Sequence, residues 1–208
     1  MQLIWLRSDL RVNDNTALSA AAAAGPCVAV YLPSPEQWLE HDDAPCKVDF
    51  WLRNLKTLSQ ALGELNIPLL IRNAPRWDDA PQVLLDLCRQ LKVDAVHFNE
   101  EYGLHETRRD AAVADRLKAQ GIDARRYLDQ LLFKPGSVLT KTGSYFQVFS
   151  QFRKVCYERL HRSLPRLVSA PMAQAPLHII SDAIPAQIQG FDTPGERLRA
   201  LWPAGEIE

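Results

Sequence analysis

Five short apolar runs alternate along the chain with segments of helical periodicity, and this alternation limits the folds that the chain can adopt. The runs cover residues 2–7, 27–32, 68–73, 94–99 and 123–128. Strands separated by helices cannot form tight hairpins, so they pair in parallel through right-handed crossovers, and helices cover both faces of the sheet. The order predicts an α/β fold, a three-layer sandwich with a five-stranded parallel sheet.

The segments between the runs carry helix signals. Residues 48–65 place apolar side chains at alternating steps of three and four, which puts one apolar stripe on a helix. Asn15 can cap an alanine-rich helix that ends at Gly25, and further helices are expected over 81–91 and 104–120. In Rossmann-like sheets of this kind, ligands bind beyond the carboxyl ends of the strands. A pocket is therefore expected from the loops 7–11, 32–38, 73–78, 99–106 and 128–135.

The pattern changes after the fifth run. Residues 145–161 again have helical spacing, with aromatic and basic side chains. Residues 163–208 hold six of the fourteen prolines and three of the nine glycines, too many for long regular elements. We predict an α/β domain over 1–162 and a proline-rich linker over 163–208.

Charge and hydropathy indicate where in the cell the protein is expected and what it can bind. The 24 Lys and Arg residues nearly balance 25 Asp and Glu residues, so contact with nucleic acid requires a local basic face. The longest nearly apolar stretch, 18–32, is shorter than a membrane-spanning helix and is interrupted by Gly25 and Pro26. The first fifteen residues are too charged for a secretory signal. We expect a cytoplasmic protein that does not bind membranes.

Several kinds of site have no counterpart in the sequence. The four cysteines are far apart and form no C-x-x-C pair, which predicts reduced thiols and no metal site. No two glycines lie within two residues of each other, so the chain has neither a G-x-G-x-x-G motif nor a phosphate-binding loop. A G-x-S-x-G elbow is also lacking. We therefore expect no catalytic residue in this chain.

The segment 5–15 crowds charged side chains at the exit of the first strand. Arg7, Asp9, Arg11 and Asp14 lie within eight positions of one another. Isolated buried charges are costly, so an ion-paired network that braces the loop is one interpretation. A contact with a ligand or with another domain is the alternative.

A second polar cluster, 99–110, follows the fourth strand. Glu106 lies in the first turn of the helix expected there, where the helix dipole favours a carboxylate. The alternative is recognition of a heterocycle, because a carboxylate can accept two parallel N–H bonds from a ring such as a pterin.

A third cluster lies in and after the expected helix 145–161. Between residues 145 and 170 there are five Arg or Lys residues and one acid, Glu158. Arg153 and Lys154 could face the phosphates of a nucleic acid. The run could equally be the solvated face of an amphipathic helix.

Together and in this order, the three clusters resemble the N-terminal domain of the DNA photolyase and cryptochrome family. The matching motifs are W-x-R-x-D-L-R-x-x-D-N at 5–15, the loop that ends in His105 and Glu106, and the aromatic pattern YFQVFSQF at 145–152. The resemblance spans essentially the whole chain, including GFDTP at 190–194. It is most like a folate-type photolyase that acts on cyclobutane pyrimidine dimers.

The resemblance implies a light-driven enzyme that splits these dimers in UV-damaged DNA, with reduced FAD as the electron donor and a second pigment as antenna. It implies 5,10-methenyltetrahydrofolate as the antenna, with a deazaflavin as the alternative. Glu106 would hold the pterin ring and His105 would be its neighbour. Gln37 and Trp38 are further candidates for the same pocket.

In this family, FAD, the tryptophan electron relay and most of the lesion pocket belong to a helical C-terminal domain. The resemblance therefore implies that this chain lacks that domain, is inactive alone and is monomeric, and that the complete protein is a deoxyribodipyrimidine photo-lyase. Two alternatives remain. One is a cryptochrome photoreceptor without repair activity, and the other is a stand-alone nucleotide-binding regulatory domain.

Overall fold

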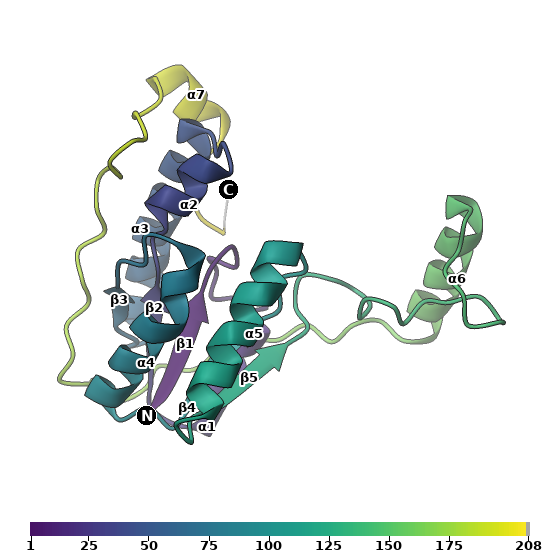
Figure 1. Cartoon of the computed structure of the whole chain (residues 1–208), viewed down its shortest axis with the longest axis horizontal. Coiled ribbons are helices and arrows are strands. Elements are labelled where there is room, and N and C mark those ends of the chain that lie inside the picture. The colour runs from purple at the N-terminus through teal and green to yellow at the C-terminus, as the bar shows by residue number, and fades with distance from the viewer. Residues whose placement is uncertain (207–208) are drawn as a thin grey trace.

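A five-stranded, fully parallel sheet forms the centre of the molecule (Figure 1). The computed structural model describes residues 1–206. The strand order is β3-β2-β1-β4-β5, so the chain builds outward from β1 in both directions. The strands are β1 (Gln2–Leu6), β2 (Cys27–Tyr31), β3 (Leu69–Ile71), β4 (Ala95–Asn99) and β5 (Asp123–Tyr127). Each lies inside one of the five predicted runs, and the α/β fold is confirmed.

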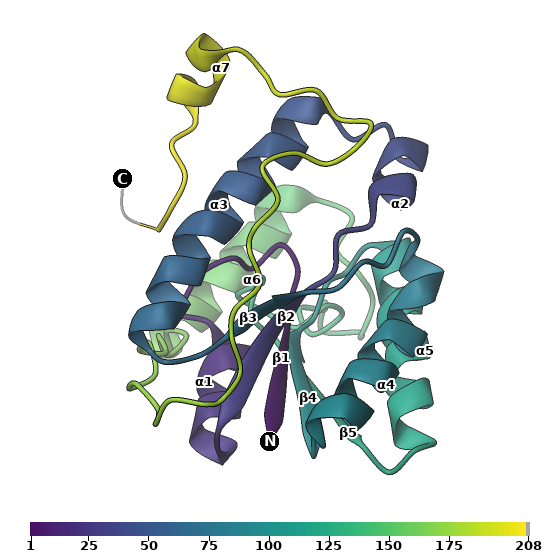
Figure 2. The ribbon, with the colours of Figure 1, turned by 90° about the vertical axis from the view of Figure 1, so that its left-hand side faces the viewer.

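Helices cover both faces of the sheet, as Figure 2 shows. The helices α1 (Thr16–Ala24) and α3 (Pro45–Glu64) pack on one face, while α4 (Ala80–Leu91) and α5 (Leu104–Lys118) pack on the other. Successive strand residues point to opposite faces, so Ile4 and Leu6 join the first core and Leu3 and Trp5 join the second. The three-layer architecture follows from this alternation.

Two local predictions about helices are confirmed. The side chain of Asn15 caps α1 by accepting a hydrogen bond from the amide of Leu18 at 3.0 Å. The apolar stripe of α3 is buried from Val48 to Leu62. A short helix, α2 (Pro35–Glu40), and a 3₁₀ turn (Trp77–Asp79) were not predicted. Both lie at the carboxyl ends of strands, where they shape the candidate site.

Residues 130–167, here called the arm, leave the α/β unit after β5 and carry α6 (Phe149–Arg162) away from the sheet (Figure 1). No residue of α6 is buried. Large apolar side chains on the arm face solvent, with Tyr145 71% and Phe149 73% exposed. The arm is therefore an extension of the compact core and contributes little to its packing.

The segment after the arm runs back over the α/β unit along β3 and α3 (Figure 2). Gln174 bonds the backbone of Cys27 through both side-chain atoms, at 2.8 and 2.9 Å. Asp182 pairs with β3, since its amide donates to the carbonyl of Leu69 at 2.9 Å. Phe191 is buried, and a short helix, α7 (Glu196–Leu201), packs near α3. The proline-rich segment thus lacks long elements but is held to the unit at several points.

Within residues 1–206, no helix combines the length and the apolar character that crossing a membrane would need.

Candidate functional site

A cavity of about 300 Å³ opens where the carboxyl ends of β1, β2 and β4 meet. Parallel strands end at the same edge of the sheet, so loops that are distant in the sequence converge there. Figure 2 shows α2 beyond one end of the sheet, near the start of α5. The side chains that line the cavity include Arg7, Trp38, Trp51, Trp77, Glu106 and Arg109. This is the edge at which the sequence predicted a pocket.

A second hollow of about 280 Å³ adjoins the cavity and shares His41, Trp77 and Arg109 with it. Gln37 and His105 line this second hollow. Glu106 and Trp38 line the first cavity. The structure thus brings all four predicted antenna residues to one end of the sheet, divided between two connected hollows.

Glu106 owes its position to the start of α5. The helix begins after Gly103, and Glu106 is in its first turn. The Glu106 carboxyl group folds back over Gly103 so closely that a Cβ atom at position 103 would collide with it. A glycine at this position therefore lets the carboxylate lie at the positive end of the helix dipole, half-buried on the cavity wall.

Gln37 and three aromatic rings form the rim of the second hollow. The Gln37 side chain accepts a hydrogen bond from the Trp77 amide at 3.3 Å and lies 3.1 Å from the Nε2 atom of His41. The ring centre of His41 is 4.9 Å from that of Trp77 and 5.4 Å from that of His105. A flat heterocycle bound here would find aromatic surfaces beside hydrogen-bonding groups.

Sequence reasoning assigned neither His41 nor Trp77 to the antenna site. His41 follows α2, a helix that the sequence did not reveal, and Trp77 lies in the 3₁₀ turn. Only its position in the sequence could have pointed to Trp77, because the residue falls in the strand-end loop 73–78, where a pocket was expected.

A buried cluster of four charged side chains lies beside the cavity. Arg109 donates to Glu101 at 2.7 Å and to Asp110 at 2.8 Å, and Arg7 Nη1 is 3.5 Å from Asp110. Burial alone would raise the pKa of Glu101, but the charges of Arg7 and Arg109 hold that pKa below its ordinary value. The Glu101 carboxylate therefore stays ionised beside the two guanidinium groups.

Arg7 has hydrogen-bonding capacity left over. Its Nη2 atom donates to the carbonyl of Asn99, whereas its buried Nε and Nη1 atoms have no hydrogen-bond partner within residues 1–206. The side chain is 8% exposed and lines the cavity. Burial lowers the pKa of this guanidinium. The carboxylate oxygens of Glu101 and Asp110 lie 4.0 and 3.5 Å from Nε and Nη1, so ion pairing within the buried cluster compensates the charge of Arg7.

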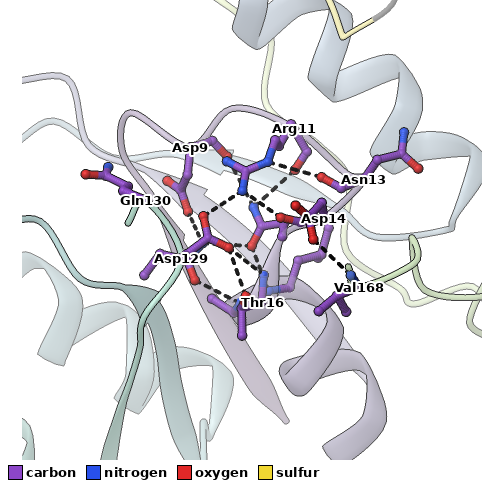
Figure 3. A network of polar contacts seen from close by, with 12 residues as sticks. Asp9, Arg11, Asn13, Asp14, Thr16, Asp129, Gln130 and Val168 are labelled. Atoms are coloured by element: carbon purple, nitrogen blue, oxygen red, sulfur yellow. Dashed lines mark hydrogen bonds and ion pairs between the residues drawn. The ribbon is translucent and has the colours of Figure 1, made fainter. Parts of the chain in front are cut away.

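The other charged residues of segment 5–15, Arg11 and Asp14, bond the two ends of the arm and do not line the cavity (Figure 3). Asp129 accepts hydrogen bonds from Arg11 at 2.6 Å and from the amide and hydroxyl of Thr16 at 3.0 and 2.9 Å. Asp14 and Val168 exchange two hydrogen bonds, at 2.8 and 2.9 Å. Both ends of the arm are therefore attached to the loop that follows β1.

These contacts bear on the two interpretations of segment 5–15, an ion-paired network or a contact with a ligand or another domain. The ion-paired network exists, but the acidic partners of the arginines come from elsewhere in the chain. Arg7 lies near Asp110, and Arg11 pairs with Asp129. The segment also bonds both ends of the arm, at Asp129 and Val168, which braces the loop further. None of these contacts involves a ligand or a second domain, so the alternative interpretation stays a prediction.

Arg153 and Lys154 lie on α6, exposed to solvent and outside both hollows. The structure does not bring them to the candidate antenna site. Their exposure leaves them available for a contact made by the outer part of the arm.

Comparisons with known proteins place this chain in a family. The family model described as DNA photolyase matches residues 2–172. The deoxyribodipyrimidine photo-lyase of Vibrio cholerae is 39% identical over 155 residues, which cover 74% of this chain and 33% of that protein. Cryptochrome-1 of Arabidopsis thaliana is 35% identical over 156 residues, 74% of this chain and 22% of that protein.

A solved structure gives the same result. A bacterial class III photolyase from Agrobacterium tumefaciens superimposes with a TM-score of 0.72 at 25% identity, covering 88% of this chain and 37% of that chain. The chain spans between a third and somewhat less than half of the length of the curated photolyases that it matches. From the matched residues, which cover most of the chain, we conclude that this protein belongs to the DNA photolyase family.

Proposed function

We propose that this chain is the antenna-binding α/β unit of a deoxyribodipyrimidine photo-lyase. The observation that carries the proposal is the cavity of about 300 Å³ at the strand ends, with Glu106 and Trp38 on its wall and the hollow of Gln37 and His105 beside it. Family membership supports the same function. The bound pigment would absorb light and pass its energy to FAD in a helical domain of the complete protein.

The residues present fit 5,10-methenyltetrahydrofolate. The Glu106 carboxylate can accept two N–H bonds from a pterin, and the rings of His41, Trp77 and His105 offer stacking surfaces. A deazaflavin is the alternative, since its flat ring would meet the same aromatic walls.

A parallel sheet suits this task because energy transfer depends on a fixed distance and orientation between two pigments. The site is built on the ends of buried strands and on the first turn of α5, which hold their side chains more firmly than a free loop would. In this proposal, residues 1–162 form the antenna unit and 163–208 lead toward the FAD domain. The exposed apolar side chains of the arm suit a contact with that domain.

A binding experiment tests the antenna function. The chain is titrated with 5,10-methenyltetrahydrofolate, and the substitution E106Q should weaken binding by about 1–3 kcal/mol, because the neutral amide cannot accept both N–H bonds as a carboxylate does. The substitution E196Q is the matched control, since Glu196 also lies in the first turn of a helix but lies outside both hollows. Equal affinities of E106Q and wild type would refute the role of Glu106.

The complete protein would act on UV-damaged DNA, and the arm offers a basic contact for it. If Arg153 and Lys154 face DNA phosphates, the double charge reversal R153E/K154E in the complete protein should flatten the salt dependence of DNA binding. If the slope of DNA binding against salt concentration is unchanged, Arg153 and Lys154 belong only to the solvated face of a helix. We propose a cytoplasmic monomer as the working form.

A cryptochrome photoreceptor is the second candidate, and the 35% identity to Arabidopsis cryptochrome-1 favours it. Repair of dimer-containing DNA by the complete protein under blue light separates the two. Folate binding without repair would support the cryptochrome. Thermal stabilisation by ATP and not by folate would point instead to a nucleotide-binding regulatory domain.

A further inference from the structure

Four tryptophans line the cavity: Trp5 from β1, Trp38 from α2, Trp51 from α3 and Trp77 from the 3₁₀ turn. Their flat rings are good stacking surfaces for a pigment. Indole is also easily oxidised, so an excited pigment beside it can take one electron from the ring. The products are an indole radical cation and a pigment radical anion. Their recombination restores both groups but loses the absorbed energy as heat.

Positively charged side chains lie against two of these rings, Trp5 and Trp77. The guanidinium carbon of Arg7 is 4.4 Å from the ring centre of Trp5, and that of Arg109 is 4.9 Å from the same ring. Arg109 also lies 5.0 Å from the ring centre of Trp77. Both arginines are buried, so water screens their charges less than it would at the surface.

The third cation lies near the cavity mouth. Lys47 Nζ is 4.8 Å from the ring centre of Trp51. Trp38 differs from the other three rings, because its close aromatic contacts are Trp51 and Phe191, with ring centres 5.0 and 6.1 Å away. Trp5, Trp51 and Trp77 thus share one feature, a cation close to the indole.

A positive charge beside an indole opposes removal of an electron, because the radical cation would form next to a like charge. Energy transfer moves no charge between the groups and is not opposed in this way. Resting on the antenna function proposed above, we propose that Arg7, Arg109 and Lys47 suppress electron transfer from the cavity tryptophans to the excited pigment. The tryptophans can then bind the pigment without quenching it.

Each cation also has an acidic partner, which reduces its field at the ring. Lys47 lies 2.5 Å from Asp43, and Arg109 is bonded to Glu101 and Asp110. The cations nevertheless lie only 4.4–5.0 Å from the ring centres. The partners provide a test of sign, because removal of a carboxylate should act in the opposite direction to removal of a cation.

Lys47 offers the cleanest test because its side chain is 51% exposed and its loss should leave the fold intact. The fluorescence lifetime of bound 5,10-methenyltetrahydrofolate is measured for wild type, K47M, D43N and the double variant K47M/W51F. K47M should shorten the lifetime roughly twofold or more by exposing Trp51 to oxidation. K47M/W51F should restore the lifetime, and D43N should lengthen it. K56M, on the exposed face of the same helix, is the control and should match wild type.

Equal lifetimes of bound folate in K47M and wild type would overturn the inference while leaving the antenna function intact. No folate binding by the wild type would instead remove the antenna function. A second measurement then still decides the inference: free riboflavin under light and oxygen should oxidise Trp51 faster in K47M than in K56M, as read by peptide mass. Equal oxidation rates would overturn it.

Discussion

His97 should make the α/β unit sensitive to mild acid. This side chain is fully buried in β4, with its Nδ1 atom 2.8 Å from the Tyr127 hydroxyl and its Nε2 atom 2.9 Å from the side-chain oxygen of Gln2. Burial, with a smaller contribution from Arg125, lowers the pKa of His97 to about 4, from an ordinary value of 6.5. The folded protein therefore keeps this ring neutral at pH values where the unfolded chain protonates it.

The sign and size of the effect follow from that difference. Above pH 6.5 the ring is neutral in both states and stability does not depend on it. Between pH 6.5 and 4 the unfolded state binds more protons than the folded state. The free energy of unfolding therefore decreases by up to about 1.4 kcal/mol for each unit by which the pH is lowered. The total loss is at most about 3.4 kcal/mol, and it is complete well below pH 4.

Urea unfolding at pH 7.5, 5.5 and 4.5 measures this loss. The substitution H97Q keeps a polar amide in the same place but removes the titrating ring, so the gap in stability between wild type and H97Q should narrow or reverse as the pH falls. H161Q, at an exposed position on α6, is the control and should follow wild type. A gap between wild type and H97Q that is the same at pH 7.5 and 4.5 would refute the reasoning.

Two further substitutions test the base of the arm and the position of the candidate site carboxylate. D129N weakens a carboxylate that accepts three hydrogen bonds, so it should cost about 2–4 kcal/mol and speed amide exchange at the start of α1. D123N, in an exposed ion pair on β5, should cost under about 0.5 kcal/mol. G103A should displace Glu106 and lower folate affinity several-fold in titration, whereas G195A, at the start of α7 with open space around it, should not. Unchanged exchange in D129N, or equal affinities of G103A and G195A, would contradict these predictions.

The sequence was sufficient for the framework because the framework depends on local patterns. A buried parallel strand appears as a short apolar run, and this holds for β1 to β4. The edge strand β5 also lies inside a predicted run, but its sequence DARRY has no buried residue. The cap at Asn15 and the stripe of α3 are likewise set within one or two turns of chain. The edge of the sheet that carries the cavity followed from the parallel order alone.

The finer shape of the candidate site depends on contacts between distant residues, which local spacing does not encode. The helix α2 is six residues long and begins with Pro35, too short to show a period, so the place of His41 was not predictable. The acidic partners of Arg7 and Arg11 lie about a hundred positions along the chain. The roles of Glu106 and His105 in binding stay predictions, carried by the resemblance and by their place on the cavity walls.

The attachment of both ends of the arm to one loop has a consequence for how this family can diversify. Asp129 and Val168 are bonded to neighbouring residues, so the chain departs from the α/β unit and rejoins it at almost the same point. An excursion with adjacent ends can grow or shrink at little entropic cost, because closure entropy changes slowly with length. The outer part can therefore be remodelled to suit a different neighbour while the α/β unit keeps its geometry.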